Sequence, residues 1–278
     1  MGVCHKSKGQ LEIAVKMFQT ALTIKKDYSE AYKNLGITQK DIGQLDNAVK
    51  SLKKAIDLSP EYIDAHYNLA VTFTSLGQLN EALTSYQKVV EINPNFVEAH
   101  NNLANTHRDL GNLEDALDNY QKAVKLNPNF AEVHNNIANT FKDLDQLNDA
   151  LESYNKAIQL NPNFAEAFYN KGIVLKRLRK LEEAIEYFNK AISIRPDFAE
   201  AYNNLGSAFH ALGQKSKAIQ CCEKALLINP KYAEGYNNFG NILKDLRRSS
   251  AAKKYYEKAL EIKSDYAEAL INLGTLYN

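Results

Sequence analysis

The sequence predicts an all-α protein built as a solenoid of antiparallel helix pairs, and three observations support this prediction. The six prolines, Pro60, Pro94, Pro128, Pro162, Pro196 and Pro230, are separated by a constant 34 residues. Within each period, apolar residues recur at helical spacing in two separate stretches. Glycine stands between the two stretches in four of the repeats. A fixed period with these features indicates stacked helical hairpins rather than one compact core.

The proline spacing defines a repeat frame in which each proline takes position 32. We expect residues 1–278 to form a single solenoid. Its seven complete repeats cover residues 29–62, 63–96, 97–130, 131–164, 165–198, 199–232 and 233–266. A partial repeat over residues 1–28 precedes them, and a second over residues 267–278 follows them.

The partial repeats leave predicted helices without a partner at both ends of the solenoid. Solenoids need polar caps at their ends. Residues 267–278 instead carry Leu270, Leu273, Leu276 and Tyr277 with no second helix to cover them. We therefore expect a homo-oligomer, formed by end-to-end association or by exchange of a terminal helix.

The first half of each repeat predicts an amphipathic helix. At 100° per residue, positions 3, 4, 7, 8, 10, 11 and 14 fall on one arc about 160° wide. In the repeat over residues 97–130, this arc carries Ala99, Leu103 and Leu110, whereas Asn102 and Asn105 lie on the opposite side. One face of the helix therefore packs and the other meets solvent.

The second half of each repeat predicts another helix, with positions 17, 20, 21, 24, 27 and 28 on one stripe. Small residues at positions 8, 20 and 27 allow close approach between helices, and large residues at positions 4, 11 and 24 fill the space between them. Gly43, Gly77, Gly111 and Gly213 at position 15 are expected in left-handed helix caps. Basic residues, including Arg179 and Arg247, replace the glycine in two repeats.

The recurring residues resemble the signature of the tetratricopeptide repeat family. Leu at position 7, Gly or Ala at 8, Tyr or Phe at 11, Ala at 20, Tyr or Phe at 24, Ala at 27 and Pro at 32 follow its 34-residue pattern over essentially the whole chain. The resemblance implies a right-handed superhelix, or α-solenoid. Lys171 departs from the pattern at position 7, where we expect the stem to pack and the ammonium to reach solvent.

Some repeats, such as NPNFAEVHNNIANTFKDL, are similar to the superhelical arm that precedes the catalytic domain of O-GlcNAc transferases and to related bacterial repeats. The catalytic glycosyltransferase domain is absent from this sequence. The resemblance therefore implies a mode of binding, in which first helices line a concave wall, and implies no activity.

Asparagine occupies position 6 of the first helix in eight successive repeats. These residues, the asparagine ladder, are Asn34, Asn68, Asn102, Asn136, Asn170, Asn204, Asn238 and Asn272. Asparagine inside a helix costs about 0.5 kcal/mol relative to alanine, and a solvated face would favour Glu, Lys or Gln. Each amide offers donors and an acceptor that match a peptide backbone of any sequence. We predict that the ladder binds an extended peptide, with auxiliary contacts one turn further on from Asn105, Asn139 and Asn241.

Two interpretations of the ladder remain open. The amides bind a ligand, or they are a remnant of repeat duplication and bond one another between repeats. Position 5 varies more, which favours the first interpretation; its residues are Lys33, Tyr67, Asn101, Asn135, Tyr169, Asn203, Asn237 and Ile271. Replacing Asn102, Asn136 and Asn170 by alanine should then weaken binding and leave the melting temperature unchanged or higher. If the amides bond between repeats, the same changes should lower the stability.

Two further recurring positions have predicted structural roles. Position 2 is acidic in every repeat, and if Asn95, Asn129 or Asn163 is the N-cap, it is the N3 site of a capping box. Position 4 carries histidines in three successive repeats; these are His66, His100 and His134. Successive repeats would hold the imidazoles too far apart for one metal ion, so we expect them to pack in the core.

Composition argues against several classes of function. Lys plus Arg number 34 against 33 Asp plus Glu, without long runs of one sign, so we expect neither nucleic acid nor a membrane as a partner. Cys4, Cys221 and Cys222 offer no disulfide framework, which favours a cytoplasmic location. Motifs for phosphate binding, zinc or a nucleophile are missing, so we expect no cofactor, no metal and no catalysis.

The sequence therefore predicts a non-catalytic scaffold that binds a protein or an extended peptide. The carboxylate clamp of chaperone-binding relatives needs Lys at position 2 and Arg at position 6, whereas this chain has acid and Asn there. An alternative is the substrate-recognition arm of a larger O-GlcNAc-transferase-like enzyme, and a third is a self-assembling structural scaffold.

Overall fold

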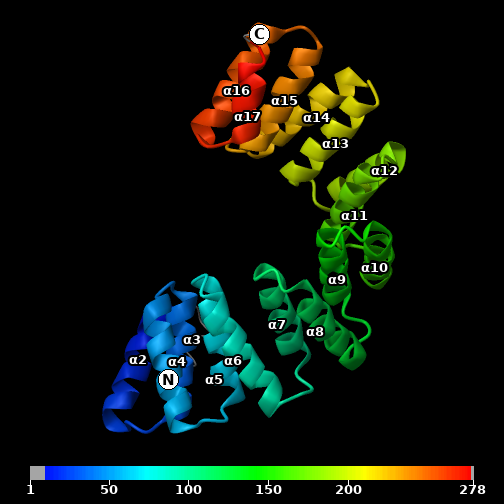
Figure 1. Ribbon diagram of the computed structural model, residues 1–278. Helices are drawn as coiled ribbons and strands as arrows, with labels where there is room; N and C mark the ends of the chain where they lie inside the picture. Colours follow the sequence, from blue (N-terminus) through cyan, green and yellow to red (C-terminus); the bar gives the residue numbers. More distant parts are fainter. Residues whose placement is uncertain (1–9, 277–278) are drawn as a thin grey trace. The chain divides into compact units, whose positions relative to one another are not determined.

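The computed structural model, drawn in Figure 1, describes residues 10–276 of the chain. Within this range it contains sixteen helices and no strand, which confirms the predicted all-α class. The chain divides into two compact units, unit 1 over residues 1–136 and unit 2 over residues 137–278. Continuity of one solenoid across both units stays a prediction, and Cys4 and Tyr277 lie outside the described residues.

Both units are stacks of helix pairs that recur with the predicted period. Unit 1 contains α2 (Leu11–Ile24), α3 (Ser29–Asp41), α4 (Leu45–Leu58), α5 (Ile63–Ser75), α6 (Leu79–Ile92), α7 (Val97–Asp109) and α8 (Leu113–Leu126). The boundary between the units falls within α9 (Ala131–Asp143). Unit 2 continues with α10 (Leu147–Leu160), α11 (Ala165–Arg177), α12 (Leu181–Ile194), α13 (Ala199–Ala211), α14 (Lys215–Ile228), α15 (Ala233–Asp245), α16 (Ser249–Ile262) and α17 (Ala267–Gly274). First helices of successive repeats also contact each other, as α13 contacts α15.

The core of each helix pair follows the predicted alternation of small and large residues. The position 20 alanines are fully buried, and so are the large side chains of Tyr120, Tyr154 and Tyr256 at position 24. Position 8 is small because the second helix passes close by. A Cβ added to Gly240 would lie 2.5 Å from Cε1 of Tyr256, well inside van der Waals contact. The core therefore runs along each stack as a series of tight helix crossings.

The turn between paired helices has the predicted left-handed cap. Gly43, Gly77, Gly111 and Gly213 have φ values of 77°, 71°, 82° and 74°. The residues that replace glycine at position 15 adopt the same conformation, with φ of 61° at Asp145, 62° at Arg179 and 59° at Arg247. Side chains are strained in this region, so the backbone turn is retained at a cost where glycine is missing.

The first helices do not begin with the predicted capping box. The N-caps of α7 and α11 are Phe96 and Phe164, and neither makes a side-chain cap hydrogen bond. Asn95 lies one residue before the N-cap of α7, and its backbone N–H donates to Oδ1 of Asn93 at 3.1 Å. In the same way, the side-chain oxygens of Asn127 and Asn161 accept from the backbone N–H groups of Asn129 and Asn163, at 3.2 Å and 3.1 Å. These asparagines therefore stabilise the loop between repeats. In α7 and α11 the acidic residue at position 2 is not part of a capping box.

Histidines at position 4 connect the first helix to the loop that precedes it. The Nε2 atoms of His66, His100 and His134 donate to the carbonyl oxygens of Pro60, Pro94 and Pro128 at 2.8 Å, 2.9 Å and 3.1 Å. His100 is only 6% exposed. The predicted structural role of these side chains therefore includes a hydrogen bond to the proline turn.

Lys171 departs from its predicted behaviour. The residue is buried, with 8% exposure, and does not extend its side chain freely into solvent. Nζ instead donates to Oη of Tyr187 at 2.6 Å and to Oδ1 of Asn155, and it lies 3.9 Å from the centre of the Tyr187 ring. Neutral acceptors on α10 and α12 therefore hold this cation inside the stack, and the side chain does not extend outward to solvent as expected.

Cys221 and Cys222 both lie in unit 2 as free thiols. Burial raises the pKa of Cys221 to about 11 and that of Cys222 to about 12. Neither thiol is therefore a ready nucleophile near neutral pH. None of the helices between residues 10 and 276 has the length and apolar character needed to cross a membrane.

Candidate functional site

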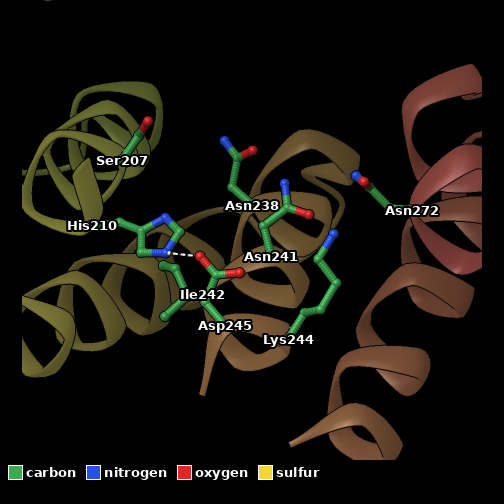
Figure 2. Close-up of a pocket in the computed structure, with 8 residues that line it drawn as sticks. All are labelled: Ser207, His210, Asn238, Asn241, Ile242, Lys244, Asp245 and Asn272. Atoms are coloured by element: carbon green, nitrogen blue, oxygen red, sulfur yellow. Dashed lines mark hydrogen bonds and ion pairs between the residues drawn. The ribbon is translucent and has the colours of Figure 1, made fainter. Parts of the chain in front are cut away.

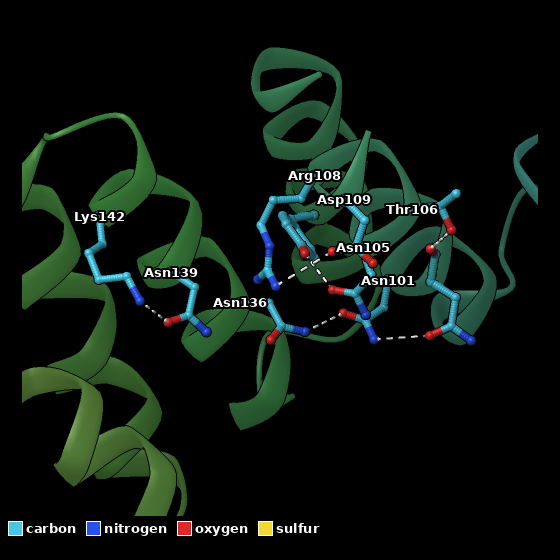
Figure 3. A network of polar contacts seen from close by, with 10 residues as sticks. Asn101, Asn105, Thr106, Arg108, Asp109, Asn136, Asn139 and Lys142 are labelled. Atoms are coloured by element: carbon cyan, nitrogen blue, oxygen red, sulfur yellow. Dashed lines mark hydrogen bonds and ion pairs between the residues drawn. The ribbon is translucent and has the colours of Figure 1, made fainter. Parts of the chain in front are cut away.

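The asparagine ladder makes hydrogen bonds between successive repeats. In five cases Nδ2 of the ladder residue donates to the position 5 side chain of the preceding repeat, 35 residues earlier. These bonds join Asn102 to Tyr67 (2.9 Å), Asn136 to Asn101 (3.1 Å), Asn204 to Tyr169 (3.1 Å), Asn238 to Asn203 (3.1 Å) and Asn272 to Asn237 (2.9 Å). Figure 3 shows the bond from Asn136 to Asn101. Inter-repeat bonding, which the sequence left open as an alternative, is therefore present in both units.

Position 5 acts as the acceptor for the ladder. Asn101, Asn203 and Asn237 are 3%, 0% and 1% exposed, so their amide oxygens depend on the ladder for a partner. The alternation between Asn and Tyr at this position looked variable in the sequence, but both side chains present an oxygen at the same place. That shared oxygen is the signal that sequence reasoning missed.

The exception at position 5 supports this interpretation. Lys33 carries no acceptor, and Asn68 of the following repeat turns its amide back to the carbonyl oxygen of Asp64 at 2.8 Å. Lys33 itself lies 3.7 Å from the Asp64 carboxylate. The ladder bond is therefore lost where the acceptor is lost.

Most ladder residues keep some accessible surface. Asn34 on α3 and Asn170 on α11 are half-buried, like the other members except Asn204, which is 8% exposed. Asn204 is also fully engaged, because its Oδ1 accepts from Nζ of Lys176 at 2.6 Å and its Nδ2 donates to Tyr169 and to the Glu200 carbonyl. In unit 2, Asn238 and Asn272 therefore have more hydrogen-bonding groups accessible to a ligand than Asn204 has.

The auxiliary asparagines at position 9 are oriented by tyrosines of the same repeat. The hydroxyls of Tyr120, Tyr154 and Tyr256 donate to Oδ1 of Asn105, Asn139 and Asn241, at 2.5 Å, 2.7 Å and 2.8 Å. The tyrosines are buried at position 24, so each amide oxygen faces inward. The amide nitrogen consequently points to the surface of the first helices, beside the ladder. Apart from Val71 beside Tyr86, position 9 carries Asn wherever position 24 of the same repeat carries Tyr.

Basic side chains at position 12 border the same face of each unit and were not recognised in the sequence. They are Lys40 and Arg108 in unit 1, and Lys142, Lys176, His210 and Lys244 in unit 2. Lys142 donates to Oδ1 of Asn139 at 3.4 Å, as Figure 3 shows, and His210 lies 2.9 Å from the Asp245 carboxylate. Burial lowers the pKa of Lys176, an effect that Glu234 opposes. The face therefore combines amide donors with positive charge.

A polar pocket of about 350 Å³ lies on this face in unit 2. Its lining comes from α13, α15 and α17 and consists of Ser207, His210, Asn238, Asn241, Ile242, Lys244, Asp245 and Asn272. Figure 2 shows Asn238, Asn241 and Lys244 extending from α15 to one side, between His210 of α13 and Asn272 of α17. Three predicted site residues therefore meet in one cavity. Over residues 10–276, no group of three His, Cys, Asp or Glu side chains is arranged to hold a metal ion.

Sequence comparison places the chain in a family. The family described as TPR repeat matches residues 39–77, 72–107, 104–145, 138–178 and 180–213. The family described as Tetratricopeptide repeat matches residues 199–232 and 233–266. The chain belongs to the tetratricopeptide repeat (TPR) family. A comparison with curated proteins finds no match.

Several solved TPR structures are similar to this one. A TPR protein from Parabacteroides merdae ATCC 43184 is 22% identical, with a TM-score of 0.74 over 90% of this chain and 99% of that chain. Cut9–Hcn1, an APC/C hetero-tetramer, is 16% identical with a TM-score of 0.73 over 96% of this chain, which spans 53% of that chain. YrrB, described as a TPR protein with an unusual peptide-binding site, is 24% identical with a TM-score of 0.52 over 67% of this chain and 96% of that chain. At these identities the likeness shows the fold alone.

Proposed function

We propose that this TPR protein is a non-catalytic scaffold that binds an extended polypeptide on the first-helix face of each unit. The observation that carries the proposal is the orientation of the position 9 amides. Tyr120, Tyr154 and Tyr256 hold the oxygens of Asn105, Asn139 and Asn241, so three pairs of amide N–H donors are directed to the surface. Backbone carbonyls of an extended chain are suitable acceptors for such donors.

The ladder supports the same function while also serving the fold. Asn238 and Asn272 each use one N–H in an inter-repeat bond and remain half-buried. An amide carries a second N–H and an oxygen with two lone pairs, which are available for a ligand. The two interpretations of the ladder are therefore compatible, and replacement by alanine should weaken the fold as well as binding.

The family and one structural neighbour agree with this assignment. TPR repeats typically mediate protein–protein interaction, and YrrB, 24% identical, is described as having a peptide-binding site. The similarity to O-GlcNAc transferase arms rests on the sequence pattern of the repeats, and no contact among residues 10–276 favours that alternative. Self-association through α17 is part of the proposal, because Leu270 and Ile271 are 51% and 66% exposed.

The proposal is tested by changing the donors without removing the tyrosine partners. The triple variant Asn105→Asp, Asn139→Asp and Asn241→Asp keeps an oxygen for each tyrosine and replaces each outward N–H pair with a carboxylate oxygen. Asn80→Asp, Asn148→Asp and Asn189→Asp, exposed on the second helices, make the same change in charge elsewhere and form the matched control.

Both triple variants and the unchanged protein are screened against an array of unrelated extended peptides, and affinities are measured for the peptides retained. Loss of one donor contact on unit 1, or of up to two on unit 2, at about 0.5–1.5 kcal/mol each should weaken binding by at least about twofold in the first variant and little in the control. An unchanged protein that retains no peptide, or equal affinities for all three proteins, refutes the proposed function.

A further inference from the structure

Charge is segregated among the turn segments, which are positions 10–20 of each repeat and join its first helix to its second. The first four, residues 38–48, 72–82, 106–116 and 140–150, are the acidic turns and contain nine Asp or Glu against three Lys or Arg. The last three, residues 174–184, 208–218 and 242–252, are the basic turns and contain nine Lys or Arg against three Asp or Glu. The two sets therefore carry opposite charge, whatever the charge of His210.

The basic turns lie side by side in unit 2. Nζ of Lys176, in the first of them, donates to Oδ1 of Asn204 on α13 at 2.6 Å. Nζ of Lys215, in the second, donates to the carbonyl oxygen of Asp245 in the third at 3.2 Å. Figure 2 shows a further contact between these two turns, from His210 to Asp245. The three turns therefore present their cations on one surface.

Several basic side chains on this surface have no partner in the protein. Among residues 10–276, the guanidinium groups of Arg179, Arg247 and Arg248 are exposed and make no hydrogen bond or ion pair. Arg179 and Arg247 also adopt the left-handed conformation, with φ of 62° and 59°, where four other repeats have glycine. The third such residue, Asp145 with φ of 61°, belongs to an acidic turn. The charge at each strained position thus matches its turn, and strain is characteristic of functional positions.

Helix stability does not account for the cations of the basic turns. The dipole of a helix favours acidic residues near its N-terminus and disfavours cations there. The second helices α4, α6 and α8 of unit 1 have acidic residues in their first turn, whereas α14 and α16 of unit 2 have none. Instead, α14 begins with Lys215 and Lys217. These cations oppose the local preference, and negative charge from a partner compensates them.

Unit 1 carries the complementary surface. Asp46 and Glu81, from two successive acidic turns, line the same pocket. Glu114 is exposed in the first turn of α8. Within the part of the chain that the structure describes, these three carboxylates make no hydrogen bond or ion pair. Each chain therefore has unpaired carboxylates on the turns of unit 1 and unpaired guanidinium groups on the turns of unit 2.

We propose that the basic turns of unit 2 bind the acidic turns of unit 1 in a second copy of this chain. The partner is a second copy because the chain itself carries the matching surface, with unpaired groups of the opposite sign. Guanidinium and carboxylate groups form paired, charge-assisted hydrogen bonds. This contact is separate from peptide binding by the amides and from the apolar end at α17. Salt screens exposed ion pairs and does not weaken apolar contacts, so salt distinguishes the two modes of association.

Sedimentation equilibrium of the full chain tests the proposal. Between about 0.1 M and about 1 M NaCl the Debye length falls from about 10 Å to about 3 Å, and we expect the association constant to fall by about tenfold or more. The basic-turn variant combines Arg179→Glu, Lys217→Glu and Arg247→Glu, and the acidic-turn variant combines Asp46→Lys, Glu81→Lys and Glu114→Lys. The matched control reverses three exposed lysines of the second helices outside the turn segments, as Lys156→Glu, Lys190→Glu and Lys224→Glu.

Each turn variant alone should associate at least about tenfold more weakly than the unchanged protein at low salt, because surfaces of like charge then meet. An equimolar mixture of the two turn variants should regain association, since the surfaces of one are again opposite in charge to those of the other. The control variant should associate as the unchanged protein does. Thermal melting of all variants checks that the fold is kept.

Three results overturn the proposal: a monomer mass of the unchanged protein at low salt, association that salt does not weaken, and a mixture of folded turn variants that stays monomeric. Association that persists at high salt and in both turn variants belongs to the apolar end at α17. If the unchanged protein is monomeric but polyglutamate, RNA or anionic phospholipid vesicles bind it and not the basic-turn variant, the partner is a foreign anion and the second copy is wrong. Peptide binding by the amides is tested separately by the peptide array.

Discussion

Replacing Asn238 by alanine should destabilise unit 2, whereas the same change at Asn68 should not destabilise unit 1. Asn238 donates to Oδ1 of Asn203, a residue with 0% exposure, so the variant leaves a buried acceptor without this partner. Leaving a buried polar group unsatisfied costs about 1–3 kcal/mol. Alanine returns about 0.5 kcal/mol through its higher helix propensity. The net loss is therefore about 0.5–2.5 kcal/mol.

Asn68 is the matched control because its amide bonds only within its own helix, to the Asp64 carbonyl at 2.8 Å. Its replacement removes no inter-repeat bond and should leave the unfolding free energy of unit 1 unchanged or slightly higher. Repeat proteins unfold in segments. Urea denaturation followed by circular dichroism should therefore be combined with amide hydrogen exchange on α13, α15 and α5.

The expected result is a lower urea midpoint and weaker protection of α13 and α15 in Asn238→Ala, without loss of protection around α5 in Asn68→Ala. If the two variants are equally stable, or if Asn238→Ala is the more stable one, the inter-repeat bonds contribute nothing. The ladder would then be explained by ligand binding alone.

Four further outcomes follow from the structure. Arg247→Gly should raise the unfolding free energy by about 1 kcal/mol, because φ at this residue is 59°, and an unchanged denaturation midpoint would contradict the strain. Lys171→Leu should raise the melting temperature by removing a cation that is 8% exposed and has only neutral partners, whereas a fall would show that its bonds to Tyr187 and Asn155 outweigh burial. Burial raises the pKa of Cys222 to about 12, so this thiol should resist iodoacetamide at pH 8 in the folded protein, and rapid labelling detected by peptide mapping would refute this. The unfolded thiol loses its proton near pH 9 and the folded thiol near pH 12. The contribution of Cys222 to the unfolding free energy is therefore complete below pH 9 and declines between pH 9 and pH 12. Light scattering should show association at high concentration through the exposed Leu270 and Ile271, and a concentration-independent monomer mass would exclude it.

The periodicity of the sequence was sufficient to predict the fold because each residue type that the packing or the turns require recurs in several repeats. Ala at position 20, a large residue at position 24 and glycine at position 15 each recur with one spacing, and the structure confirms the tight crossings and left-handed turns that they predict. Arg247 adopts the glycine conformation because the turn is determined by the helices on both sides of it. Local chemistry was harder to predict. Asn95 looked like an N-cap, but the helix begins one residue later and Asn93 bonds the loop instead.

The sequence predicted on which helix face the candidate site residues lie, but it did not predict their hydrogen bonds. The sequence identified Asn102 and Asn105 as polar residues on one helix face, but a helical projection contains no information about the neighbouring repeat. The partners lie in different places, since Tyr67 belongs to the repeat before and Tyr120 to the second helix of the same repeat. Only the stacking distance between helices brings them within hydrogen-bond reach.

The two rows of asparagines consequently differ in what they can give to a ligand. A position 9 amide such as Asn241 has its oxygen fixed by a tyrosine of its own repeat, so its outward donors do not depend on how the repeats are stacked. A ladder amide such as Asn238 is bonded to the preceding repeat, so any movement between repeats changes both that bond and the direction of its remaining N–H. A peptide that bonds Asn238 therefore also favours the stacking in which Asn238 reaches Asn203. In the proposed function, binding and repeat stacking are therefore coupled through the ladder, and contacts to the position 9 amides would add affinity without that coupling.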